Sequence, residues 1–250
     1  MKNLVINGEE YTNIFLSNDG TIKKYSSKSV GAWERLVSKK LDFLVNPLDA
    51  RNLTKEEKGR FPNSKSLITL PFYESYQTFE EKSFSFPFMT GDLLTLFKYH
   101  LSLLKKSHQE DVIIVDMNAG NLLINEDNDI KFNDLDAALV DGDKENAELC
   151  YDDDARDVTL LKRMLISEDK RCLMEIYLNY LASGSFKRVV GDSVRSGFMF
   201  PCTELKNKAL SYLDDELIME DDYFEELVDG LISYERAVEL EMKKVLEKYH

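Results

Sequence analysis

Short apolar runs alternate with polar turns near the middle of the chain. One apolar run precedes a polar loop that starts at Asp116 and ends at Asn121. Two further apolar runs, 122–124 and 130–132, are separated by a polar turn and lead to Asp134. Short β-type runs joined by a polar turn predict a hairpin. Folding of this hairpin is expected to bring the side chains of Asp116, Asn121 and Asp134 to one end of it.

These three side chains suit a divalent cation and the transfer of a phosphoryl group. Mg²⁺ prefers carboxylate and amide oxygens, supplemented by water and phosphate. Phosphoryl transfer needs mainly positioning, charge neutralisation and a residue that orients the attacking hydroxyl. Asn121 and Asp134 are therefore the candidate metal ligands, and Asp116 is the candidate residue that orients the acceptor.

The part of the chain before the hairpin shows strands, then a helix, then strands again. Three apolar runs within residues 3–25 are divided by Asn-Gly and Asp-Gly pairs, which predicts a three-stranded meander. Apolar residues at three- to four-residue spacing predict a helix over 29–44. Residues 46–66 mix charge with Pro, Gly and Asn and predict a loop with room for one helical turn. Two aromatic-rich segments, 67–76 and 82–89, predict a second hairpin.

Outside the central hairpin, the second part of the chain is mainly helical in pattern. An amphipathic helix is predicted over 92–108, another over 155–166, and helical spacing continues through most of 170–250. Strands in the first part and helices in the second predict the α+β fold class.

Composition limits the compartment and the partners. The chain has 250 residues, 43% of them hydrophobic, but its apolar runs are far shorter than the roughly 20 residues needed to span a bilayer. The N-terminal residues lack the apolar segment of a signal peptide. Three scattered cysteines indicate neither a disulfide framework nor a zinc site. We therefore expect a cytoplasmic protein.

The net charge of −14 argues against nucleic acid and anionic membranes as partners. It also opposes the binding of any anionic ligand. Local cations, namely Mg²⁺ and a lysine, must reverse the field where such a ligand binds.

The spacing of Asp116, Asn121 and Asp134 resembles the catalytic and metal-binding segments of protein kinases and of kinase-like phosphotransferases that act on small molecules. In that family an Asp is followed after four residues by an Asn, then by two strands and a second Asp. Gly120 before Asn121 is more similar to aminoglycoside and choline kinases than to most protein kinases. The resemblance is to minimal, bacterial-type members of the superfamily, including the atypical protein kinases.

The resemblance implies a two-lobed protein kinase-like fold and the cofactors ATP and Mg²⁺. The small N-lobe, reduced to a β-sheet plus one helix, would comprise residues 1–89. The mainly helical C-lobe would comprise residues 90–250. In such a C-lobe, an early acidic residue of the central helix holds the backbone of the catalytic loop, and Asp157 is the candidate.

The resemblance also implies the residues that bind the nucleotide. Lys23 and Lys24 both lie on the strand that carries the phosphate-orienting lysine, and only one can face the site because side chains alternate along a strand. The family pattern of a lysine, any residue and an aromatic favours Lys23. Glu34 is the candidate partner of this lysine, and Phe86 and Phe88 belong to the candidate hinge that would bind adenine.

Departures from the family pattern leave three functions open. Ile114 and Val115 replace the usual His-Arg before the catalytic Asp, and the glycine-rich phosphate loop is nearly absent. The leading prediction is Mg²⁺/ATP-dependent phosphoryl transfer to a hydroxyl of a protein or small molecule. The alternatives are a pseudokinase that binds nucleotide as a regulatory module, and nucleotidyl transfer (AMPylation) on the same fold.

Overall fold

The structure is a computed structural model that describes residues 2–6, 9–82, 90–142, 158–183, 229–230 and 244. Helices and antiparallel sheets both occur, in agreement with the predicted α+β class. None of the described helices is long and apolar enough to cross a membrane. In chain order the elements are β1 (Lys2–Ile6), β2 (Glu9–Leu16), β3 (Thr21–Ser26), α1 (Val30–Ser38), β4 (Asp49–Asn52), α2 (Lys55–Arg60), β5 (Ser66–Pro71), β6 (Gln77–Thr78), α3 (Thr90–Gln109), β7 (Val112–Ile113), the 3₁₀ turn η1 (Ala119–Asn121), β8 (Leu122–Ile124), β9 (Ile130–Phe132), β10 (Leu139–Val140) and α5 (Val158–Ser183).

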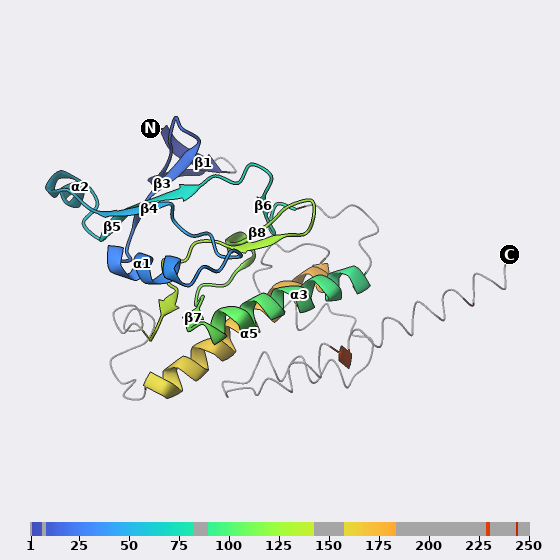
Figure 1. The fold of residues 1–250 in the computed structure, drawn as a ribbon. Coiled ribbons are helices and arrows are strands. Elements are labelled where there is room, and N and C mark those ends of the chain that lie inside the picture. The colour runs from blue at the N-terminus through green and yellow to red at the C-terminus, as the bar shows by residue number, and fades with distance from the viewer. Residues whose placement is uncertain are drawn as a thin grey trace.

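The N-terminal part forms a five-stranded antiparallel sheet with the order β1-β2-β3-β5-β4 (Figure 1). The meander predicted over 3–25 is confirmed as β1, β2 and β3. Strand β4 was missed because its sequence, Asp-Ala-Arg-Asn, is charged and largely exposed. Strand β5 pairs with β3 on one side and β4 on the other. Both edges of β5 are therefore occupied, so the prediction that 67–76 and 82–89 pair as a hairpin is wrong. Residues 83–89 themselves lie outside the described ranges.

Helix α1 is fixed to this sheet by a short apolar face. Trp33 and Leu36 are buried almost completely. The helix ends at Ser38, earlier than the end predicted from the pattern over 29–44. Lys40 follows with a φ of 53°, a left-handed conformation that cannot continue a right-handed helix. The apolar residues beyond it are still buried, but in a turn rather than in a helix.

Helices α3 and α5 pack against each other on the far side of the central hairpin from the sheet (Figure 1). His100 of α3 lies between them and is completely buried, with its Nδ1 hydrogen-bonded to the hydroxyl of Tyr177. Burial lowers the pKa of His100 well below its ordinary value, so the ring is neutral.

The predicted central hairpin is confirmed as β8 and β9, with β6 as a third strand. The segment after α1 fastens this hairpin to the N-terminal part of the molecule. The backbone N–H of Phe132 donates to the carbonyl of Phe43 at 2.8 Å, and the N–H of Val45 donates to the carbonyl of Phe132 at 2.9 Å. These bonds fix the end of β9, and therefore the residues that follow it, relative to the sheet.

Candidate functional site

The loop before β8 holds Asp116 in a defined orientation. The Asn121 side-chain nitrogen donates to the Asp116 carbonyl at 2.9 Å and to its Oδ2 at 3.3 Å. Asn118 Nδ2 donates to Asp116 Oδ1 at 3.2 Å. The carboxylate is thus oriented by two amides while it remains exposed to an incoming molecule. Because the nitrogen of Asn121 faces Asp116, its carbonyl oxygen remains available as a ligand for a cation.

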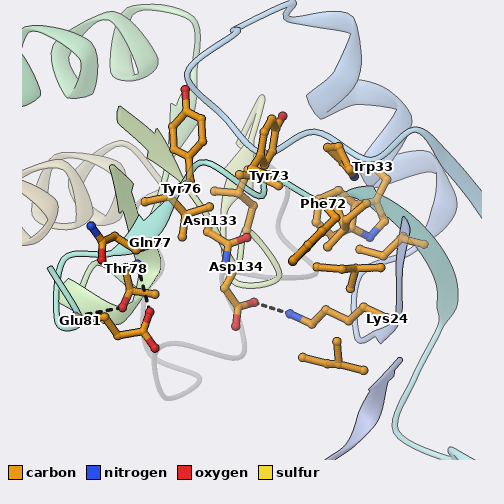
Figure 2. A pocket seen from close by; sticks show the side chains of 18 residues that line it. Lys24, Trp33, Phe72, Tyr73, Tyr76, Gln77, Thr78, Glu81, Asn133 and Asp134 are labelled. Atoms are coloured by element: carbon orange, nitrogen blue, oxygen red, sulfur yellow. Dashed lines mark hydrogen bonds and ion pairs between the residues drawn. The ribbon is translucent and has the colours of Figure 1, made fainter. Parts of the chain in front are cut away.

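The hairpin places Asp134 at the same end as this loop, as its sequence predicted. The backbone N–H of Asn133 donates to the carbonyl of Asn121 at 2.8 Å, which pairs the residue before β8 with the residue after β9. Asp134 follows with a φ of 52°, a conformation uncommon for residues other than glycine. Its side chain points toward Lys24 of β3 (Figure 2).

Lys24, rather than Lys23, faces the site, so the predicted register was wrong by one residue. Lys24 Nζ lies 2.5 Å from Asp134 Oδ1 and 2.7 Å from Asp136 Oδ2, and its side chain is only 9% exposed. Burial opposes the charged form of Lys24, but the carboxylates of Asp136 and Asp134 outweigh it and raise the pKa of Lys24 above its ordinary value. Lys24 is therefore a cation at neutral pH. Lys23 lies on the opposite face of the strand.

Glu34 does not reach either lysine. It lies on the exposed side of α1, directly after the buried Trp33, and forms no ion pair with any part of the chain that the structure describes. The predicted pair between Glu34 and the strand lysine is therefore wrong for this structure. The apolar face of the helix, set by Trp33 and Leu36, decides which way Glu34 points.

A buried carboxylate supports the entry to the loop. Asp169 of α5 is completely buried and accepts the backbone N–H groups of Ile114 and Val115, each at 2.8 Å. His108 Nε2 lies 2.9 Å from the same carboxylate. Val115 has a φ of 70°, which is strained for a β-branched residue. Asp169 stabilises this conformation, and the chain then turns Asp116 outward.

Asp169 has the role that the sequence analysis gave to Asp157, which lies outside the described residues. Asp169 was missed because its neighbours Ser167, Glu168 and Lys170 are typical of a solvated helix surface. The sequence feature that indicates burial of Asp169 is its position four residues from both Leu165 and Leu173, on an otherwise apolar stripe of the helix. An acid on such a stripe is buried and needs donors.

A cavity of about 390 Å³ lies between the sheet and the central hairpin (Figure 2). Pockets of about 300 to 1,000 Å³ with an apolar wall and a few polar groups are typical of small-molecule sites. The predicted hinge residues Phe86 and Phe88 lie outside the described ranges. The lining combines aliphatic, aromatic and polar residues: Ile14, Ile22, Lys24, Trp33, Val45, Ile68, Leu70, Pro71, Phe72, Tyr73, Tyr76, Gln77, Thr78, Glu81, Leu123, Asn133, Asp134 and Leu135.

The polar end of this cavity contains the groups suited to phosphate and to a cation. Lys24 offers an ammonium, and Asp134 offers a carboxylate whose side chain is 40% exposed. Oδ1 of Asp134 contacts Lys24, whereas Oδ2 has no hydrogen-bond donor among the described residues. Asp134 Oδ2 and the amide oxygen of Asn121 are oxygens of the kind that Mg²⁺ prefers, and they are the atoms of this site that could hold the cation.

No protein-family model matches the chain, and a search of curated proteins finds no match.

Replacing Asp169 by Asn should destabilise the protein, because one buried backbone N–H would then face an amide nitrogen instead of a carboxylate oxygen. We expect a loss of about 3 kcal/mol in the free energy of unfolding. Urea denaturation followed by the fluorescence of the single tryptophan measures it. Glu168→Gln is the matched control and should cost less than about 1 kcal/mol, since the neighbouring carboxylate is partly exposed. Equal losses would contradict the role of Asp169.

Lys24→Met should destabilise the ligand-free protein, because Asp134 and Asp136 would lose the cation between them. Since Asp134 is partly exposed, solvent screens the repulsion, and we expect a loss of about 1 to 2 kcal/mol. Lys23→Met, on the other face of β3, should change the free energy of unfolding by less than about 0.5 kcal/mol. The same urea titration compares the two variants, and a larger effect at Lys23 would refute the observed register.

Proposed function

We propose that the protein is a Mg²⁺/ATP-dependent phosphotransferase with a two-lobed, protein kinase-like architecture, its N-lobe within residues 1–89 and its C-lobe within 90–250. Its reaction is transfer of the γ-phosphate of ATP to a hydroxyl of a protein or small molecule. The observation that carries the proposal is the meeting of Lys24 and Asp134 at one end of a ligand-sized cavity. At the same end of the hairpin, the loop that Asp169 stabilises exposes Asp116, and Asn121 donates a hydrogen bond to its carboxylate.

Different residues of the site bind different parts of Mg-ATP. The aliphatic wall, including Ile22, Ile68 and Leu123, accommodates an apolar ring such as a nucleobase. Lys24 donates to phosphate oxygens as a point charge. Asp134 and Asn121 would hold Mg²⁺, which would neutralise the charge of the phosphates.

Asp116 acts on the acceptor rather than on the nucleotide. Its exposed carboxylate accepts a hydrogen bond from the acceptor hydroxyl and orients the oxygen for attack. As the bond from this oxygen to the γ-phosphorus forms and the bond to the leaving phosphate breaks, the hydroxyl proton passes to Asp116. The amides of Asn118 and Asn121 keep the carboxylate in place throughout.

One observation favours a second candidate function. Glu34 is exposed and forms no ion pair with Lys24, whose ammonium instead contacts Asp134 and Asp136. A nucleotide-binding regulatory module without turnover, a pseudokinase, is compatible with that arrangement. Intact mass spectrometry after incubation with Mg-ATP separates the possibilities, because a gain of phosphate indicates a kinase and a gain of AMP indicates nucleotidyl transfer.

Asp134→Asn should abolish Mg²⁺-dependent binding of ATP, because the neutral amide is a weaker ligand for a hard cation. At an ATP concentration of about 100 times Kd, linkage predicts a rise of about 5 °C or more in the Tm of the wild type. We expect no such rise for the variant. Asp127→Asn, an exposed position on the turn at the other end of the same hairpin, is the control and should respond like the wild type.

Asp116→Asn should separate binding from chemistry. The amide keeps the shape of the side chain but cannot take the proton of the acceptor, so turnover should fall by about 10² to 10⁴. The affinity for Mg-ATP, measured by isothermal titration, should remain close to that of the wild type. Unchanged turnover would remove Asp116 from the chemistry. Wild-type binding with no transfer to protein, sugar or amino-alcohol acceptors would favour the pseudokinase.

A further inference from the structure

Asp136, two residues after Asp134, is bound on both of its carboxylate oxygens by β3. Its Oδ2 lies 2.7 Å from Lys24 Nζ, and its Oδ1 accepts the hydroxyl of Ser26. Its side chain is 20% exposed, half the value of Asp134. The two carboxylates therefore differ: Asp134 has one oxygen directed to Lys24 and one without a donor among the described residues, whereas each oxygen of Asp136 contacts a side chain of β3.

Ser26 connects Asp136 to helix α1. The indole Nε1 of Trp33 donates to Ser26 Oγ at 3.0 Å, and the backbone N–H of Lys28 donates to the same oxygen at 3.0 Å. With both acceptor positions filled, the hydroxyl hydrogen is directed to Asp136. Ser26 is completely buried, so this orientation is fixed. A chain of contacts thus runs from Trp33 through Ser26 and Asp136 to Lys24.

Glu34 cannot take the place of Asp136 without dismantling this arrangement. Successive residues of an α-helix are about 100° apart around its axis. Turning Glu34 toward Lys24 would rotate Trp33, which is 2% exposed, out of the core and break its bond to Ser26. The helix therefore contributes to the site through Trp33, which acts on Asp136 by way of Ser26 of β3, instead of through a glutamate.

We propose that Asp136 is the positioning residue of Lys24 and that Asp134 alone provides the carboxylate for the metal. The inference rests on the proposed function, since it assigns Lys24 to the phosphates of the nucleotide. An ammonium has three N–H donors. Asp136 accepts one of them and Asp134 a second, which leaves the third for a phosphate oxygen. When a cation binds Asp134, Asp136 keeps the ammonium at the polar end of the cavity.

The test is isothermal titration of Mg-ATP into the full-length wild type and variants. Asp136→Asn should weaken binding roughly 10- to 100-fold, as expected for the loss of a hydrogen bond between charged groups. Glu34→Gln, the matched control, should bind within about twofold of the wild type. In a Lys24→Met background, Asp136→Asn should cause no further loss, because a residue that acts through Lys24 has nothing left to position.

The dependence on Mg²⁺ distinguishes positioning from metal binding. For Asp136→Asn at saturating ATP, the Mg²⁺ concentration that gives half-maximal binding should equal that of the wild type. A shift to higher Mg²⁺ would make Asp136 a metal ligand and overturn the proposal. Weaker binding by Glu34→Gln together with unchanged binding by Asp136→Asn would also overturn it.

A second variant covers the case in which Asp136→Asn does not fold. Ser26→Ala leaves the carboxylate in place but removes the hydroxyl that orients it, so binding should weaken about 3- to 10-fold and not at all in the Lys24→Met background. Equal losses in both backgrounds would show a structural role only and refute the proposal.

If the wild type itself binds no Mg-ATP, the proposed function fails and this inference fails with it. A wild type that binds while these variants bind equally well refutes the inference alone.

Discussion

The buried carboxylate of Asp169 is the interaction on which the site depends. Its charge is removed from water, which is costly unless donors replace the lost hydration. Two consecutive backbone N–H groups, those of Ile114 and Val115, together with His108 replace it. The same hydrogen bonds hold Val115 at a positive φ, which its branched side chain disfavours. That turn sends Asp116 away from the core, and the amides of the loop only refine its orientation.

Lys24 is the second constraint, because it joins the N-terminal sheet to the end of the hairpin across 110 residues of sequence. One ammonium between two carboxylates leaves a local excess of negative charge, in a chain whose net charge is already −14. A polyphosphate alone would be repelled from such a site. A divalent cation at Asp134 would reverse the balance, so in the proposed function the metal and the nucleotide bind as a unit.

Sequence reasoning succeeded where the determinants are local and failed where packing decides. The spacing of Asp116, Asn121 and Asp134 places them at the same end of the hairpin, since the residue before β8 pairs with the residue after β9. The choice between Lys23 and Lys24 depends on which face of β3 packs inward, and apolar residues occur on both faces. The position of Glu34 was misjudged for a related reason. The apolar spacing continued past Ser38, where the helix ends, and only the burial of Trp33 and Leu36 fixes its rotation.

The contacts of α1 also indicate which changes in this helix would affect Lys24. The helix has nine residues, too short to be stable without tertiary packing, so its position is set by the burial of the indole and by the bond from Trp33 to Ser26. Charges on its exposed face are screened by solvent and act weakly on Lys24. A shift in packing at Trp33 would instead pass to Asp136 through a single buried hydroxyl. Helix α1 is therefore coupled to the candidate phosphate site by the packing of Trp33 and by its hydrogen bond to Ser26, and among the described residues Glu34 forms no ion pair with Lys24.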